Sequence, residues 1–312
     1  MFEGLTVPEG RTVRVRVPAS TSNLGPGFDV LGLALDLRLE VVVSERPEGH
    51  LVEVSGPSES EWPAREDLLL AAFDRVQKAF GGTASGRHFE VHSQIPIGRG
   101  IGSSGAAVAA GLMLGATLAP REVTRDDLMS IGLALEGHPD NVASALFGGC
   151  VIAVPRIGAA PRIVQLEVSD SIAFCLAWPA SQLSTRTARD LLPEKVAFSD
   201  AVQNPRFLAL LIEGLRTGDP ELLALGAEDR LHVQHRLPHI PGGAAALDAA
   251  RESGAFSATI SGSGSALFAI TDEDNASAVA GAMENELRRA DGQAWSKVVS
   301  IVPSAPMPTL GV

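Results

Sequence analysis

Lysine and cysteine are both scarce in this chain. Of its 25 basic residues, only Lys78, Lys195 and Lys297 are lysines. A Walker-type phosphate loop needs a lysine directly after its last glycine, so the stretch between positions 78 and 195 cannot contain one. The two cysteines, Cys150 and Cys175, have no metal-site spacing and form no disulfide framework, which favours a reducing cytoplasm.

Positive charge and long apolar runs are lacking as well. A formal net charge of -12 argues against binding to nucleic acid or to a membrane surface, because both are polyanions. The longest apolar run, 106–119, is shorter than the ~20 residues that span a bilayer. The opening segment MFEGLTVPEGRTVRVRV has no apolar core of signal-peptide length. We therefore expect a soluble, cytoplasmic protein of one large or two medium-sized domains.

Glycine and serine are concentrated in PIGRGIGSSGA, residues 96–106, directly before an alanine-rich helix expected from about Ser104 to Leu118. The glycines also satisfy the G-x-G-x-x-G spacing of dinucleotide-binding loops. The acidic residue that such a loop requires would be Glu122, which lies in a predicted loop and not at the end of a second parallel strand. The dinucleotide interpretation is therefore weak, and a turn without a ligand is the simpler alternative.

Phosphate binding is the interpretation of this loop that we favour. Amides at the start of a helix and the positive end of the helix dipole attract anions. The hydroxyls of Ser103 and Ser104 are suited to phosphate oxygen or to Mg²⁺. Two further glycine loops support a ligand site: 17–35, with Asn23 and Asp29 around a Gly-Pro-Gly turn, and 260–270 between two strands. We expect the three loops to meet at one cleft.

The order of strands and helices predicts α+β layers and not a regular βαβ alternation. Strands are expected at 12–20, 33–45, 50–56, 87–98, 150–155, 162–168, 172–179, on both sides of the 260–270 turn, and at 295–304. Helices are expected at 65–81, 104–118, 124–137 with Thr124 as its cap, 141–149, 200–236 with a break at Asp219-Pro220, and 274–290. A domain boundary is expected near Pro155, which divides the chain into 1–155 and 156–312.

Several motifs together resemble the galactokinase, homoserine kinase, mevalonate kinase and phosphomevalonate kinase (GHMP) superfamily. NLGPGFD (23–29), EGHPDNVASALFGG (136–149), ARDLLP (188–193) and LHVQHR with IPG (231–236 and 240–242) are similar to the homoserine kinase branch in particular. The resemblance extends from about residue 13 to residue 270. It implies a two-domain α+β GHMP kinase fold, with an N-terminal ATP-binding domain like the second domain of ribosomal protein S5 and a ferredoxin-like C-terminal domain. It also implies phosphorylation of L-homoserine by ATP with Mg²⁺, on the route to threonine, and a homodimer.

The resemblance further implies roles for individual residues. The nucleotide would lie over the loop formed by Pro96, Ile97, Gly98, Arg99, Gly100, Ile101, Gly102, Ser103, Ser104, Gly105 and Ala106. Ser104 and Glu136 would hold Mg²⁺. The residues expected to bind homoserine are Asn23, Asp29, His138, Asn141, Arg189 and Arg236. The arginines would bind its carboxylate and Asp29 its ammonium group, and Ser104, His138 and Asn141 would lie nearest the reaction.

The sequence leaves several alternatives open. Asp140 is the candidate general base, yet the resemblance favours transfer without a dedicated base, with Asp140 capping the helix that follows it. Asp67 stands where an asparagine often meets adenine, so nucleotide preference is open. Other classes fit less well: the serine–glycine loops lack the G-x-S-x-G elbow of hydrolases, and Pro238 breaks the helical face that a zinc site at 232, 235 and 239 would need.

Two other functions remain as alternatives to a homoserine kinase. One is a sister kinase of the same superfamily acting on another small alcohol, such as mevalonate. The other is a regulator of the same fold that binds a nucleotide without turning it over.

Overall fold

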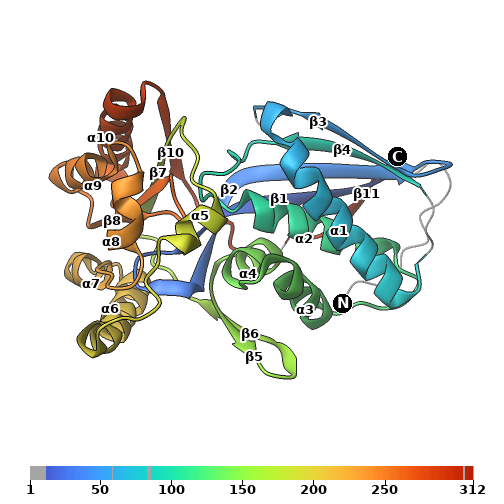
Figure 1. The fold of residues 1–312 in the computed structure, drawn as a ribbon, viewed down its shortest axis with the longest axis horizontal. Helices are drawn as coiled ribbons and strands as arrows, with labels where there is room; N and C mark the ends of the chain where they lie inside the picture. Colours follow the sequence, from blue (N-terminus) through green and yellow to red (C-terminus); the bar gives the residue numbers. More distant parts are fainter. Residues whose placement is uncertain (1–11, 58, 83–85, 305, 312) are drawn as a thin grey trace.

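The computed structural model describes residues 12–57, 59–82, 86–304 and 306–311, except for the side chains of 63–67. Two β-sheets with their covering helices lie side by side along the long axis of the molecule (Figure 1). Most of the segment considered as a signal sequence, and the side chain of Asp67, lie outside the described part of the chain.

The larger sheet has seven strands in the order β11-β1-β2-β4-β3, with β5 pairing with β2 and β6 with β5. Its strands are β1 (Thr12–Asn23), β2 (Gly27–Glu45), β3 (His50–Ser55), β4 (Arg87–Ser93), β5 (Cys150–Arg156), β6 (Ala159–Leu166) and β11 (Thr309–Gly311). Among the described strands of this sheet, only β3 and β4 pair in parallel, and the other pairs are antiparallel. The three-residue β11 was not predicted, because so short a strand has no periodicity of its own.

Strand β1 continues through Pro18 to Asn23, beyond its predicted end at Ser20. The register with β2 shifts between Pro18 and Ala19. At such a bulge the ladder is interrupted, so a proline, which cannot donate a hydrogen bond, is tolerated within the strand. The added residues carry β1 to the first glycine loop.

Four helices accompany the larger sheet: α1 (Pro63–Phe80), α2 (Ser103–Leu118), α3 (Arg125–Glu136) and α4 (Asp140–Phe147). All residues of α2 except Ser104 and Leu118 are buried, between the sheet and α1 (Figure 1). A Cβ atom at Gly111 would lie only 2.2 Å from the carbonyl oxygen of Leu69 in α1. The glycine therefore lets the two helix backbones come close together, and α2 is held firmly from both sides.

Helix α3 begins with the predicted cap. The hydroxyl of Thr124 accepts the backbone N–H of Asp127 at 3.1 Å, and the Asp127 carboxylate accepts the N–H of Thr124 at 2.9 Å. The helix ends at Glu136, where Gly137 follows with φ 81°. This left-handed turn separates α3 from α4 by only three residues, so Glu136 and His138 lie near each other.

The smaller sheet has four antiparallel strands in the order β10-β7-β9-β8. They are β7 (Ala173–Pro179), β8 (Ser257–Ile260), β9 (Leu267–Thr271) and β10 (Ala294–Val299). The accompanying helices are α5 (Thr185–Asp190), α6 (Phe198–Thr217), α7 (Pro220–Gly226), α8 (Val233–Arg236), α9 (Gly243–Glu252) and α10 (Glu273–Asp291), with a 3-10 turn at Leu237–His239. A further 3-10 turn, Glu59–Glu61, directly precedes α1 beside the larger sheet. The predicted break at Asp219-Pro220 is confirmed, because Asp219 caps α7 through the N–H groups of Glu221 and Leu222.

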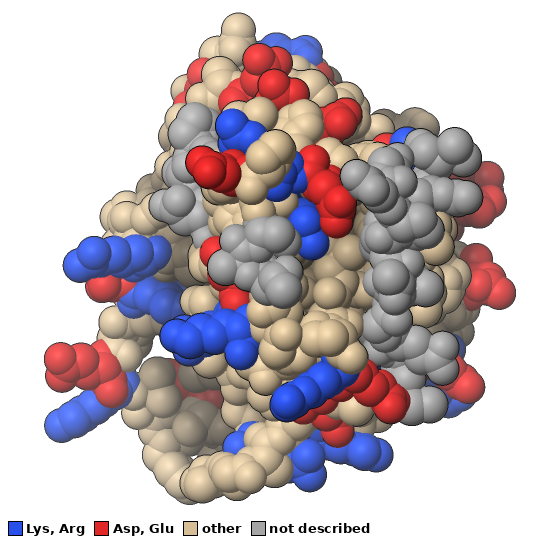
Figure 2. All heavy atoms as spheres, turned by 90° about the vertical axis from the view of Figure 1, so that its right-hand side faces the viewer, with Lys and Arg blue, Asp and Glu red and all other residues tan. Residues whose placement is uncertain are grey.

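The segregation of helices and mostly antiparallel strands confirms the predicted α+β class. The predicted boundary near Pro155 falls within β5, and the hairpin of β5 and β6 keeps the chain on the larger sheet as far as Leu166. The division into 1–155 and 156–312 stays a prediction. Among the described residues, no helix has both the length and the apolar character needed to cross a membrane. On the face that Figure 2 shows, acidic and basic side chains are interspersed.

Candidate active site

The loop before α2 turns repeatedly through glycines in the left-handed region. Gly98, Gly100 and Gly102 have φ values of 72°, 75° and 68°. A Cβ atom at Gly100 would lie 2.3 Å from the carbonyl oxygen of Ser261, and one at Gly102 would lie 2.0 Å from the hydroxyl of Ser20. Both the conformation and the available space therefore require glycine. The loop is pressed against the 260–270 loop on one side and β1 on the other.

Helix α2 starts directly after this loop, with Gly102 as its N-cap and no side chain bonded to the cap position. The first N–H groups of a helix have no partner within it, and the helix dipole places partial positive charge there. Residues 103–106 include no acidic side chain, and Ser103 and Ser104 both line the adjoining cavity. This end of α2 is therefore suited to bind a phosphate group.

The three glycine loops meet at one cavity, as the sequence predicted. Its walls come from both halves of the chain and consist of Ser22, Asn23, Phe28, Asp29, Gly98, Gly100, Gly102, Ser103, Ser104, His138, Asp140, Asn141, Leu183, Thr185, Arg189, Arg236, Gly262 and Ser263. All six residues predicted to bind homoserine are among them. The cavity thus combines the start of α2 with side chains of both charges.

Part of the predicted nucleotide loop does not line this cavity. The residues in question are Pro96, Ile97, Arg99, Ile101, Gly105 and Ala106. Ile97, Ile101 and Ala106 belong to the hydrophobic core and anchor the loop from beneath. Gly105 faces α4, where a Cβ atom would lie 2.8 Å from that of Asn141.

The side chain of Arg99 is bound elsewhere in the molecule. It is buried, and its guanidinium donates to both carboxylate oxygens of Glu61 at 2.9 and 3.1 Å. It also donates to the carbonyl groups of Ile97, Pro179 and Ala180. Arg99 therefore connects the glycine loop to the end of β7 in the smaller sheet.

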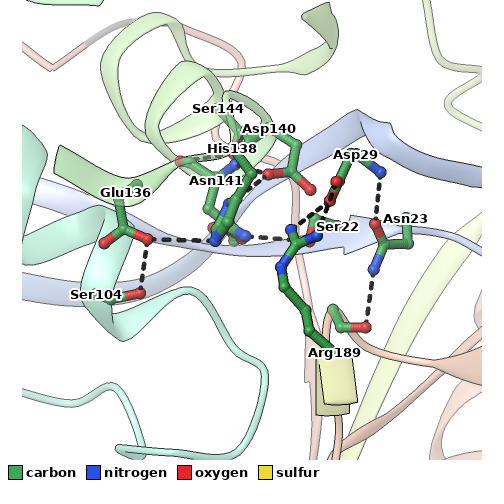
Figure 3. Close-up of polar contacts among 12 residues, drawn as sticks. Ser22, Asn23, Asp29, Ser104, Glu136, His138, Asp140, Asn141, Ser144 and Arg189 are labelled. Atoms are coloured by element: carbon green, nitrogen blue, oxygen red, sulfur yellow. Dashed lines mark hydrogen bonds and ion pairs between the residues drawn. The ribbon is translucent and has the colours of Figure 1, made fainter. Parts of the chain in front are cut away.

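A chain of polar contacts crosses the floor of the site from α2 to α4 (Figure 3). The Ser104 hydroxyl donates to Oε2 of Glu136 at 3.3 Å, and the same oxygen lies 3.5 Å from Nε2 of His138. Nδ1 of His138 lies 3.0 Å from Oδ1 of Asp140. Burial lowers the pKa of His138, but the hydrogen bond and the charge of Asp140, together with the charge of Glu136, outweigh it, so the pKa is raised.

Asp140 does not cap α4 with its side chain, which corrects one expectation. The N-cap of α4 is Pro139, and Asp140 is the first residue of the helix. Its Oδ1 accepts the N–H of Asn141 at 2.9 Å as well as contacting His138. The side chain is almost completely buried and orients the imidazole.

The donor set at Ser104 and Glu136 fits a magnesium ion. A hydroxyl and a carboxylate are the oxygen ligands that Mg²⁺ prefers, and Mg²⁺ often completes its shell with water and substrate phosphates. In the described part of the chain, no three or more His, Cys, Asp or Glu residues are grouped as a complete metal site. The oxygens of Ser104 and Glu136, beside the start of α2, are therefore suited to an Mg²⁺ ion that binds together with a phosphate ligand.

Asn23 and Asp29 lie on either side of the first glycine loop, both with positive φ, at 70° and 55°. The Asn23 amide donates to the carbonyl oxygen of Gly262 at 2.8 Å, and its Oδ1 accepts the N–H of Asp29 at 3.0 Å. Asn23 thereby joins the first loop to the third. Such strained non-glycine residues cluster at functional sites.

Asp29 and Arg189, expected to bind opposite ends of one ligand, bind each other in this structure. Nη2 and Nη1 of Arg189 donate to the two carboxylate oxygens at 2.8 and 3.1 Å (Figure 3). Both side chains are about one-third exposed, at 38% and 35%. The hydrogen bond to Asp29 raises the pKa of Arg189 despite its partial burial.

Arg236 is a buried cation at the same cavity. Its Nε donates to the carbonyl oxygen of Ala188 at 3.1 Å and its Nη1 to that of Gly262 at 3.2 Å. Burial and the nearby charge of Arg189 lower its pKa to about 10. No carboxylate of the described residues lies within 4 Å of its nitrogen atoms. A buried charge of this kind is stabilised by an anionic ligand.

Phe28 lines the cavity as well, although it was not predicted as a site residue. The guanidinium carbons of Arg189 and Arg236 lie 5.6 and 5.2 Å from the centre of its ring, within cation–π distance. The ring therefore lies close to both cations of the site. Its place inside the motif NLGPGFD was the available signal. Ser22, Leu183, Thr185 and Ser263 also line the cavity without having been singled out.

Comparisons with known proteins identify the family to which this fold belongs. Residues 67–149 match the model of the GHMP kinases N terminal domain, and residues 211–289 match that of the GHMP kinases C terminal. The chain belongs to the GHMP kinase family, a class of small-molecule phosphotransferases with two domains of mixed helices and sheets. Within that family, the curated relatives it is similar to are homoserine kinases.

Two of these relatives and one solved structure give the extent of the similarity. The homoserine kinase of Synechococcus sp. (strain RCC307) is 37% identical over 289 residues, which cover 88% of this chain and 89% of the relative. That of Streptomyces coelicolor is 42% identical over 275 residues, or 86% and 87% of the two chains. The crystal structure of homoserine kinase from Cytophaga hutchinsonii superposes with a TM-score of 0.82 at 27% identity and covers 96% and 97%.

Proposed function

We propose that this chain transfers the γ-phosphoryl group of ATP to the side-chain hydroxyl of L-homoserine and forms O-phospho-L-homoserine for threonine biosynthesis. Curated homoserine kinases at 37% and 42% identity over most of the chain support this function. The observation that carries it in the structure is the buried, carboxylate-free Arg236 in the same cavity as the start of α2. Arg236 is suited to bind the carboxylate of an amino acid, and the start of α2 is suited to bind a phosphate.

The nucleotide end of the proposal rests on the loop before α2. The amides of Gly100–Ser104 would face the β- and γ-phosphates, and the dipole of α2 would add favourable charge. Because α2 is buried on nearly all sides, its first turn is fixed before ATP binds. A preorganised site of this kind stabilises the charge that develops during phosphoryl transfer.

Ser104 and Glu136 are the residues that would hold Mg²⁺. Their oxygens lie 3.3 Å apart at the junction of α2 and α3. When bound, the ion neutralises phosphate charge. The protein keeps Glu136 oriented through its contact with His138.

The zwitterionic end of homoserine would bind on the opposite wall. Arg189 and Arg236 would share its carboxylate, and Asp29 would receive its ammonium group. The ligand would bind between Asp29 and Arg189. Its ammonium group would replace Arg189 as the partner of Asp29, and its carboxylate would replace Asp29 as the partner of Arg189. Mevalonate has a carboxylate that could draw Arg189 away from Asp29 but no ammonium group to replace Arg189 there, which favours homoserine over that sister substrate.

The transfer would proceed without a dedicated base. His138 and Asn141 would orient the homoserine hydroxyl, whose oxygen forms a new bond to the γ-phosphorus while the bond to the bridging oxygen of ADP breaks. The hydroxyl proton would pass to an oxygen of the transferred phosphoryl group. Asp140 is already bound to His138 and to the N–H of Asn141, which supports a positioning role for it. Catalysis then depends chiefly on positioning.

A coupled assay of ADP release tests this function against both alternatives. Homoserine, serine, threonine and mevalonate are compared, each with and without Mg²⁺. The proposal predicts Mg²⁺-dependent turnover that is fastest with homoserine. Preference for mevalonate would instead indicate a sister kinase, and ATP binding without turnover of any of the four would indicate a regulator.

Cytoplasmic location and assembly as a homodimer are further parts of the proposal. The net charge of -12 and the interspersed surface charges in Figure 2 support a protein whose partners are small molecules and not nucleic acid or membrane. Light scattering during size-exclusion chromatography tests the dimer: a mass near 65 kDa is expected from the chain mass of 32.5 kDa, and a monomer mass would contradict it.

A further inference from the structure

His232 is a completely buried imidazole that touches two parts of the site without lining the cavity itself. It precedes α8, the short helix that carries Arg236. Its Nε2 lies 2.8 Å from the carbonyl oxygen of Gly25 in the first glycine loop. Its Nδ1 lies 3.3 Å from Nη1 of Arg236. The ring also lies 5.2 Å from that of Phe28.

These two contacts define the protonation of the ring. A carbonyl oxygen only accepts hydrogen bonds, so Nε2 must carry the hydrogen that it donates to Gly25. A guanidinium only donates, so Nδ1 must carry a lone pair that accepts from Arg236. The imidazole is therefore neutral, in the Nε2–H form. Burial and the charge of Arg236 favour the same state: together they lower the pKa of His232, although the charges of Asp229 and Asp29 and the hydrogen bond to Gly25 act in the opposite direction.

Nδ1 of His232 is one of the hydrogen-bond acceptors that hold the guanidinium of Arg236 in place. Ala188 holds Nε, and Gly262 and His232 hold Nη1. Among the described residues, none accepts a hydrogen bond from Nη2. The guanidinium is thus held on one side and keeps its other amino group for an anion.

We propose that His232 is a positioning residue. As a neutral Nε2–H imidazole, it orients the guanidinium of Arg236 toward the substrate carboxylate and connects Arg236 to the turn at Gly25. The inference rests on the proposed function, because it assumes a carboxylate-bearing substrate. Its effect is specific: the loss of the Nδ1 acceptor weakens recognition of the carboxylate and leaves the nucleotide end of the cavity unchanged. A purely structural His232 would affect both ends together.

The protonation state is tested first, without any substrate. Long-range ¹H–¹⁵N NMR spectra of the protein labelled at histidine nitrogen distinguish the three forms of the ring. The signals of His232, assigned with His232→Gln, are expected to show a protonated Nε2 and an unprotonated Nδ1 at pH 7. An imidazolium or an Nδ1–H ring would overturn the proposal, whatever the enzyme's substrate.

Two substitutions then separate the two hydrogen bonds. His232→Asn keeps a side-chain oxygen near the position of Nδ1, and His232→Gln keeps an amide donor near the position of Nε2. Because the hydrogen bond to Arg236 involves a charge, we expect His232→Gln to raise KM for homoserine about tenfold, with KM for ATP unchanged. His232→Asn is expected to restore much of the loss. Arg236→Ala sets the upper limit of the effect.

The readout that isolates the carboxylate is the preference for homoserine over 3-aminopropan-1-ol, which has the same hydroxyl and ammonium groups and no carboxylate. His232→Gln should reduce this preference about tenfold, and His235→Gln, on the same helix, should leave it at the parent value. An equal loss for both substrates would show that His232 acts only on stability and would overturn the inference. A parent enzyme that does not phosphorylate homoserine would instead contradict the proposed function. The NMR experiment would still determine the protonation state of His232 in that case.

Discussion

The carboxylate of Asp29 and the guanidinium of Arg189 bind each other through two hydrogen bonds, although 160 residues separate them in the chain. Each group needs a partner of opposite sign, and a zwitterionic amino acid supplies both. A ligand entering between them therefore exchanges one ion pair for two. If both residues bind homoserine as proposed, the existing pair orders both side chains beforehand, which reduces the ordering that binding requires.

Asp29→Asn tests whether Asp29 binds the ammonium group of homoserine. We expect KM for homoserine to rise roughly 10- to 100-fold, because one charge-assisted hydrogen bond is lost. The comparison substrate is 4-hydroxybutyrate, which is homoserine without its ammonium group. The parent should strongly prefer homoserine, and the variant should lose most of that preference. Asp36→Asn, at a half-buried position of the same strand where the carboxylate contacts Lys297, is the control; an unchanged preference in Asp29→Asn would refute the assignment.

Ser104→Ala removes one proposed Mg²⁺ ligand. Turnover is expected to fall about tenfold or more, and the Mg²⁺ concentration at half-maximal rate should rise, because the ion loses a protein oxygen. Steady-state rates measured over a Mg²⁺ titration give both values. Ser130→Ala, which removes a hydroxyl bonded to the Asp126 carbonyl on α3, provides the control. A fall in turnover without any shift in the Mg²⁺ titration would remove Ser104 from the metal site.

Gly100→Ala tests the shape of the phosphate loop. Alanine at φ 75° is strained, and its Cβ would lie 2.3 Å from the Ser261 carbonyl oxygen, so backbone must move. The control is Gly158→Ala in the β5–β6 turn, where φ is 71° and nothing lies within 4 Å of the added atom. Denaturant unfolding should show a loss of about 1 kcal/mol for Gly158→Ala, because the Cβ atom is strained in the left-handed region. The loss for Gly100→Ala should be larger, together with a raised KM for ATP; equal losses with unchanged KM would contradict the close approach.

The lowered pKa of His232 predicts a pH dependence of stability. The unfolded chain binds a proton at about pH 6.5, while the folded protein does so only at a lower pH. The stabilising contribution of neutral His232 is thus present above pH 6.5 and is lost as pH falls through the lowered folded pKa, by up to about 1.4 kcal/mol per pH unit. The free energy of unfolding of His232→Asn should lack this decline, whereas that of His239→Asn should retain it. Parallel curves for the parent and His232→Asn would contradict the prediction.

Local features were predictable because their causes are local. The Thr124 cap, the break at Asp219-Pro220 and the glycine loop before α2 all follow from neighbouring residues. The meeting of three loops at one cavity was inferred from their composition alone. Partners distant in the sequence were not predictable in this way. Nothing near Arg99 indicates that its guanidinium binds Glu61.

The same limit applies to the charged residues of the site. The pairing of Asp29 with Arg189 depends on how the two sheets approach each other, and both residues had been given ligand roles instead. Asp140 was expected to cap α4, yet it contacts His138, because Pro139 occupies the cap position. A charged side chain can form a cap, an ion pair or a ligand contact, and only the tertiary structure determines which of these it forms.

A crystal structure with a non-hydrolysable ATP analogue and L-homoserine tests the account most directly. We predict the triphosphate over residues 96–106, with its terminal phosphate at the first turn of α2. The homoserine carboxylate should lie on Arg189 and Arg236, and its ammonium group on Asp29. Triphosphate density away from the start of α2, or an amino acid bound with its carboxylate away from both arginines, would contradict the account.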